Sequence, residues 1–127
     1  AGSTYFALNF RNQGTGTCRL EGYPGVSYVT GSSGTQVGSP ATRVAAGGTA
    51  TSPQAIDVAP GSSAHATLRA IDVGNYPPAT CTPTPVLGLR VYPPDQTAAA
   101  FVSLTSTGCA QSGPEQLQVS FVVAGGG

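Results

Sequence analysis

The sequence predicts an all-β domain, an immunoglobulin-like antiparallel β-sandwich of about seven to eight strands. Three observations support this prediction: short segments of alternating apolar and polar residues, 18 Gly and 11 Pro that separate them, and no convincing amphipathic helix. Hydrophobic residues make up 39% of the 127 residues, enough for the core of one domain. We place that domain at residues 1–124 and interpret the three glycines at 125–127 as a tail or linker.

The first half of the chain predicts strands at residues 4–10 and 18–30. In the first segment, Phe6, Leu8 and Phe10 alternate with polar or small residues, as in a half-buried strand. The second segment is interrupted by a Pro-Gly turn. Residues 31–53 contain few apolar side chains, so we expect only a weak edge strand near Gln36–Val37 and a mobile loop around Ala45–Ser52.

The second half alternates more clearly. Residues 54–73 predict two strands on either side of a PGSS turn, and residues 85–92 and 116–123 each predict one. Residues 98–105 are a further strand candidate, although three alanines leave a helix open. The side chains expected to face the core are Ile56, Val58, Ala64, Ala66, Leu68, Ala70, Leu87, Leu89, Val91, Leu117, Val119, Phe121 and Val123, with Gln116, Gln118 and Ser120 facing outward.

The charge distribution argues against two classes of partner. Only 8% of residues are charged, and five arginines balance five acidic residues. A neutral chain lacks the basic surface of a nucleic-acid-binding protein and the cationic patch of a peripheral membrane protein. No apolar run is long enough to span a bilayer. Because the chain contains no Met, we interpret it as a processed or trimmed fragment, with any targeting segment upstream of Ala1.

The three cysteines indicate whether the protein functions in an oxidising or a reducing compartment. The spacing of Cys18, Cys81 and Cys109 fits no zinc motif. We favour a Cys81–Cys109 disulfide, since both residues lie in turn-like contexts at strand ends, over three buried thiols. Closing that loop would stabilise the fold by about 3 kcal/mol. Cys18 is then either free or paired with a cysteine upstream of Ala1.

Tyr-Pro steps occur three times, at Tyr23, Tyr76 and Tyr92. Proline cannot donate to a β-ladder, so each step is expected to end a strand or turn a corner, with the ring covering the end of the core and the hydroxyl bonded to backbone. The alternative is a binding patch of exposed aromatic rings that would also include Tyr28.

Two arginines are candidates for a small polar recognition patch. Arg69 lies three residues before Asp72 near a strand end, and Arg90 is expected to neighbour them across the sheet. The alternative is that these charges keep a sheet edge from aggregating.

No pattern of catalytic residues stands out. His65 is the only imidazole, and the alternation places it on the solvent face. Ser62 or Ser63 with Asp57 or Asp72 would complete a triad on paper, but no G-x-S-x-G motif is present. The acidic residues are dispersed and match no calcium or glycosidase pattern: Glu21, Asp57, Asp72, Asp95 and Glu115. We therefore predict no enzyme activity, no cofactor and no metal.

Three blocks in order carry a family resemblance: CRLEGYPGVSYV, VAPGSSAHATLRAIDVGNYP and CTPTPVLGLRVYPPDQTAAAFV. They resemble a family of small extracytoplasmic domains from high-GC Gram-positive bacteria that is catalogued only as a domain of unknown function. The resemblance implies a secreted or lipid-anchored envelope protein, an immunoglobulin-like sandwich and no known activity. Members usually carry another Cys upstream of the first strand. Cys18 would therefore lack its usual partner here, and a truncated first strand is left open.

Together these observations predict a non-catalytic, extracytoplasmic binding module of the bacterial cell envelope. Its partner would be a protein or a cell-wall glycan. One alternative is a structural accessory or spacer domain of a larger secreted or lipid-anchored protein. Another is a small secreted hydrolase or hydrolase inhibitor.

Overall fold

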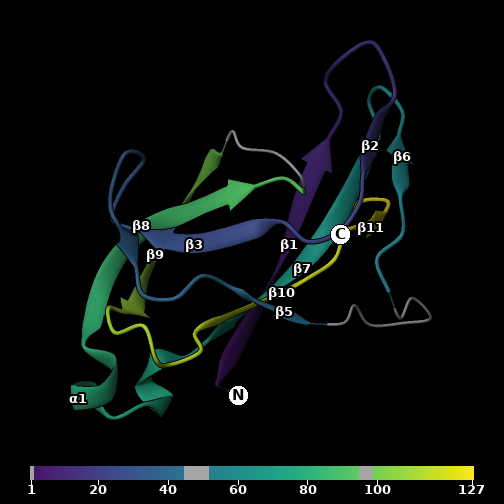
Figure 1. Ribbon diagram of the computed structural model, residues 1–127. Helices are drawn as coiled ribbons and strands as arrows, with labels where there is room; N and C mark the ends of the chain where they lie inside the picture. The colour runs from purple at the N-terminus through teal and green to yellow at the C-terminus, as the bar shows by residue number, and fades with distance from the viewer. Residues whose placement is uncertain (1, 45–51, 95–98) are drawn as a thin grey trace.

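The computed structural model describes residues 2–44, 52–94 and 99–127 (Figure 1). Most of the loop expected around Ala45–Ser52 and the acidic residue Asp95 lie outside the described residues.

The predicted all-β class is confirmed, with more and shorter strands than expected. The short strands at Gln36–Val37 and Ile56–Val58 were predicted, but those at Thr42–Val44 and Val123–Ala124 were not, since two or three residues show no clear alternation. The segment in which three alanines left a helix open is a strand from Ala100 onward. The strands are β1 (Ser3–Arg11), β2 (Cys18–Leu20), β3 (Gly25–Val29), β4 (Gln36–Val37), β5 (Thr42–Val44), β6 (Ile56–Val58), β7 (Ser63–Ile71), β8 (Pro83–Tyr92), β9 (Ala100–Cys109), β10 (Leu117–Ser120) and β11 (Val123–Ala124).

Two main sheets and a two-stranded ribbon organise the chain (Figure 1). One sheet has the order β1–β7–β10–β5, with β11 also paired to β7. The other has the order β4–β3–β8–β9, and the ribbon consists of β2 and β6. The pairings are antiparallel except for β10 with β5. Consequently β1 and β9 each lie at an edge of their sheet.

The core lies between the two main sheets. Along β1 and β7 the predicted alternation is correct: Phe6 is paired with Leu68 and Leu8 with Ala66, and all four side chains face inward. Val26, Tyr28, Leu89 and Val91 contribute from the other sheet, and Leu20 and Val58 from the ribbon. Burial of these apolar side chains is the main contribution to stability.

Two segments depart from the predicted alternation. A register irregularity between Val86 and Gly88 in β8 turns Leu87, expected in the core, to solvent with 54% of its surface exposed. In the last segment, Gln116 and Ser120 were expected outside but are buried, because each makes hydrogen bonds inside the fold. Strand β10 ends at Ser120, so Val122 is fully buried and Val123 is not.

The Tyr-Pro steps lie at strand ends and corners as predicted, but the chain around Tyr76 differs in detail. Strand β7 ends at Ile71, five residues before Tyr76. A 3-10 turn, η1 (Val73–Asn75), follows, with the Asp72 carboxylate accepting from the Gly74 N–H. A short helix, α1 (Pro78–Cys81), begins directly after Pro77.

Two of the last three glycines make hydrogen bonds to the β1–β7 part of the sheet. The N–H of Gly125 donates to the Ser63 carbonyl at 3.0 Å, and the N–H of Gly127 donates to the Asn9 side chain at 2.9 Å. These hydrogen bonds connect the last residues of the chain to β7 and β1.

Candidate binding surface

The outer face of the β3–β8–β9 sheet carries two exposed aromatic side chains and a half-buried arginine. Leu89 and Val91 of β8 point into the core, so Arg90 and Tyr92 point outward. Phe101 of β9 is paired with Arg90 across the ladder and shares its face. Tyr92 is 36% exposed and Phe101 is 40% exposed. We call Arg90, Tyr92 and Phe101 the Arg90 face.

Backbone contacts hold the side chains of the Arg90 face in place. The ring of Phe101 lies where a side chain on Gly88 would begin, and the ring of Tyr92 lies beside Gly25. Gly88 therefore leaves space that the Phe101 ring occupies, whereas Tyr92 lies at ordinary contact distance from Gly25. The guanidinium of Arg90 donates to the Gly34 carbonyl at 2.6 Å. A rigid strand scaffold with positioned rings loses little side-chain entropy on binding a partner.

The other predicted aromatic residues do not join this surface. Tyr28 is only 1% exposed; its burial raises the pKa of its phenol above the ordinary 10.0, an effect partly offset by a hydrogen bond with the Ser106 side chain. Tyr23 packs edge-to-face on Phe121 with ring centroids 5.8 Å apart, and Arg43 lies 5.2 Å from its ring centre. The four tyrosines therefore form no single patch.

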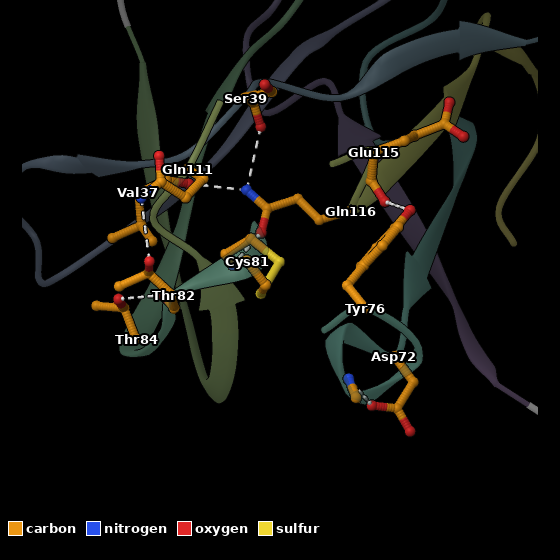
Figure 2. The surroundings of a disulfide bond; sticks show 12 residues. Val37, Ser39, Asp72, Tyr76, Cys81, Thr82, Thr84, Gln111, Glu115 and Gln116 are labelled. Atoms are coloured by element: carbon orange, nitrogen blue, oxygen red, sulfur yellow. Dashed lines mark hydrogen bonds between the residues drawn. A yellow bond between two sulfur atoms is a disulfide. The ribbon is translucent and has the colours of Figure 1, made fainter. Parts of the chain in front are cut away.

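Tyr76 has the structural role expected of a corner residue. Its hydroxyl donates to the Glu115 carbonyl at 2.5 Å, and its ring packs against Val73 and the two disulfide cysteines (Figure 2). The ring thus closes one end of the molecule.

A disulfide joins Cys81 of α1 to Cys109 of β9, with their Cα atoms 4.6 Å apart (Figure 2). The predicted pairing is confirmed. Cys18, on β2, is free and exposed. Next to the disulfide, the buried Gln116 amide accepts from the Cys109 N–H at 2.6 Å and donates to the Val37 carbonyl at 2.8 Å. Gln116 thereby connects β9 to the end of β4, a role that the sequence did not reveal.

Arg69 and Arg90 lie on different sheets, so the expected neighbourhood across one sheet is wrong. Arg69, on β7, donates to the Ser3 hydroxyl at 2.9 Å and to the Gln118 side chain at 3.2 Å. Its guanidinium stabilises the surface of the β1–β7–β10 sheet. Of the predicted binding residues, only Arg90 and Tyr92 come together. Phe101 was not among the predicted binding residues, although the alternation of residues 98–105 puts its side chain on the other face of the strand from that of Val102.

The one imidazole makes a structural contact. The Nδ1 atom of His65 lies 2.8 Å from the Gly125 carbonyl, which accepts when Nδ1 carries the proton. His65 is half-buried rather than fully facing solvent. Within the described ranges, no group of three or more His, Cys, Asp or Glu side chains could hold a metal.

The comparisons place the chain in a family. Residues 1–122 match the family described as a domain of unknown function, DUF4232. The chain belongs to this family. Neither a curated protein nor a solved structure matches this DUF4232 domain. Among the described residues, no helix is sufficiently long and apolar to cross a membrane.

Proposed function

We propose that this DUF4232 domain is a non-catalytic, extracytoplasmic binding module with an immunoglobulin-like β-sandwich fold. The observation that carries the proposal is the Arg90 face, where the half-buried Arg90 and two exposed aromatic rings lie on adjacent strands. Aromatic rings and arginine are enriched where proteins recognise partners. The Cys81–Cys109 disulfide supports a location in an oxidising compartment.

The partner is a protein or a glycan of the cell envelope. A ring such as Tyr92 offers a flat apolar surface with a polar edge, and Arg90 supplies donors for a carboxylate or a hydroxyl. A structural spacer remains the second candidate, and it would need no such face. A hydrolase is the third candidate; the contacts of His65 give it no support, since its hydrogen bond goes to backbone.

The test compares a pair of exposed aromatic residues on one sheet with a single exposed aromatic residue on the other. The disulfide-intact domain, its Tyr92→Ala/Phe101→Ala variant and a Tyr5→Ala control are incubated with purified cell-wall glycan and, separately, with solubilised envelope proteins. Tyr5 is 65% exposed on β1 and lies on the other sheet. We expect the wild type and the Tyr5→Ala control to bind one of the two fractions and the double variant to lose binding about tenfold or more. Equal retention of all three proteins would contradict the Arg90 face as the site.

A further inference from the structure

A groove runs between the edge strands β1 and β9. One hollow of about 410 Å³ lies between Phe6 on β1 and Leu104 on β9. The next, of about 290 Å³, lies between Leu8 on β1 and Val102 on β9. A third hollow, of about 180 Å³, shares Phe10 with the second and reaches Arg11, where β2 and β6 rather than β9 form the other wall. The three hollows therefore lie in a row along β1, and together we call them the groove.

The inner face of β9 is not covered by the opposite sheet. Val102 is paired with Leu89 and so points inward, yet it is 40% exposed whereas Leu89 is 2% exposed. Leu104 on the same face is half-buried. Strand β9 thus extends past β1, and one more strand beside β1 would cover these side chains, because neighbouring strands lie about 4.8 Å apart and facing sheets about 10 Å apart.

Among the described strands β1 pairs only with β7, which leaves backbone groups of β1 toward this groove without a strand partner. The N–H of Thr67 donates to Ser120 and the N–H of Ile71 donates to Gln116, so the odd-numbered residues of β7 face β10. The even-numbered residues of β7 consequently face β1, where they are paired with even-numbered residues. The N–H and C=O groups of Tyr5, Ala7 and Asn9 therefore point to the open edge.

The charges around the groove are arranged in a simple pattern. The side chains that line its middle are apolar or uncharged. Asp72 lines the end near the start of β1, and Arg11 lines the opposite end. An occupant with a neutral, apolar centre, a basic residue beside Asp72 and an acidic residue beside Arg11 would complement this pattern.

We propose that the groove binds an extended peptide segment of a partner protein, which adds as a strand to β1. Its backbone would pair with Tyr5, Ala7 and Asn9, and alternate apolar side chains would cover Val102 and Leu104. An antiparallel orientation places the acidic residue at the peptide's N-terminal end, beside Arg11, and the basic residue at its C-terminal end. This site lies on the inner side of β9, away from the Arg90 face, and does not depend on it.

The experiment uses nine-residue synthetic peptides, matched to the length of β1. Valine alternates with threonine in the centre, and the ends are Glu first and Lys last, or the reverse. Binding is measured by fluorescence anisotropy, and amide hydrogen exchange is measured by NMR. We expect the Glu-first peptide to bind more tightly than the Lys-first peptide and to slow exchange of the Tyr5, Ala7 and Asn9 amides.

Matched variants test the two halves of the site. Val102→Asp places a carboxylate in the groove and should lower the affinity for the Glu-first peptide about tenfold or more. Val102→Thr, which keeps a similar shape, should lower this affinity less. Ala7→Pro removes an edge donor without removing a β1–β7 hydrogen bond and should also weaken binding. Phe101→Ala, on the opposite face, should leave binding unchanged, so loss of the Arg90-face function and loss of peptide binding are separable.

Three results would overturn the proposal. The first is unchanged exchange of the three amides at saturating concentrations of both peptides. The second is equal binding by Val102→Asp and Val102→Thr, or equal binding of the two peptides. The third is slow exchange of the three amides in the absence of peptide, with protection that increases as the protein concentration increases. That result would assign the groove to a second copy of this chain.

Discussion

At the end of the molecule near α1, a disulfide and a buried amide join separate segments, whereas the opposite end, at the β2–β6 ribbon, depends on one asparagine (Figure 1). Asn12 is buried there. Its side chain donates to the Gly16 carbonyl at 2.7 Å and to the Val58 carbonyl at 2.8 Å, and accepts from the Gly14 N–H. Its own N–H and carbonyl are bonded to Ser62 and Gly61.

The difference shows two ways of closing the end of a β-fold. The α1 end is fixed by a covalent bond between residues 28 positions apart, which restricts the unfolded chain as well as the folded one. The Asn12 end is fixed by polar contacts that exist only in the folded state. We therefore expect the α1 end to be less sensitive to local opening than the ribbon end.

The largest effect should follow removal of the disulfide. Replacing Cys81 and Cys109 together by Ala should lower the free energy of unfolding by about 4 kcal/mol, of which the regained entropy of the open loop accounts for about 3 kcal/mol and the loss of two fully buried sulfur atoms for the rest. Guanidinium unfolding at equilibrium measures the change. Cys18→Ser is the matched control, and since Cys18 is exposed and free we expect a change within about 0.5 kcal/mol. Similar losses in the two proteins would contradict a special role for the disulfide.

Replacing the buried amide beside the disulfide should have the next largest effect. Gln116→Leu leaves the Cys109 N–H and the Val37 carbonyl without these partners inside the fold, at a cost of about 3 kcal/mol. Urea unfolding of this variant is compared with that of Gln111→Leu, whose side chain is exposed at the same end. A decrease in the free energy of unfolding of less than about 1 kcal/mol would show that water takes over the hydrogen bonds of the Gln116 amide.

The opposite end is tested by Asn12→Ala. Two carbonyls and one N–H lose their side-chain partner, but the adjacent loop is exposed and admits water, so we expect a loss of about 2 kcal/mol. Hydrogen exchange should show that faster opening is confined to β2, β6 and the loop between β1 and β2. Gln13→Ala, at an exposed neighbouring position, serves as the control. Opening that spreads equally to the α1 end would remove the distinction between the two ends.

The smallest effect should come from Tyr76→Phe. This change removes the hydroxyl group that donates to the Glu115 carbonyl and keeps the ring over the disulfide. We therefore expect the free energy of unfolding, measured by thermal unfolding, to fall by about 1 kcal/mol. Tyr92→Phe is the comparison, since the exposed Tyr92 should tolerate the change almost without loss. An equal effect in both variants would argue against Tyr76 as a structural corner.

Strands with regular alternation could be predicted from the sequence. In β1 and β7 each inward side chain has an inward partner, so the pattern of Phe6, Leu8, Ala66 and Leu68 directly gives the buried face. The disulfide could be predicted because Cys81 and Cys109 border strand ends. The pattern fails at Leu87, where a register irregularity shifts the alternation by one residue, which no local composition reveals.

The candidate site was harder to predict than the fold. Because its amide is polar, Gln116 was predicted to lie at the surface. Its burial is explained by its hydrogen bonds with Val37 and Cys109, which the fold brings close to it. Tyr28 and Tyr92 are the same residue type, yet the face of the strand decides that one is buried and the other exposed. Arg69 and Arg90 were expected together because sequence does not say which strands share a sheet.

The disulfide also determines how the domain would respond to a mechanical load. A force applied to the two ends of the chain passes from Cys81 to Cys109 through the sulfur bridge and bypasses the residues between them. At 3.3–3.6 Å per extended residue, about 90–100 Å of chain is excluded from any extension. Arg90, Tyr92 and Phe101, together with Val102 and Leu104, all lie inside this shielded segment. Strands β1 and β7 can be pulled apart while the loop that carries β8 and β9 stays closed.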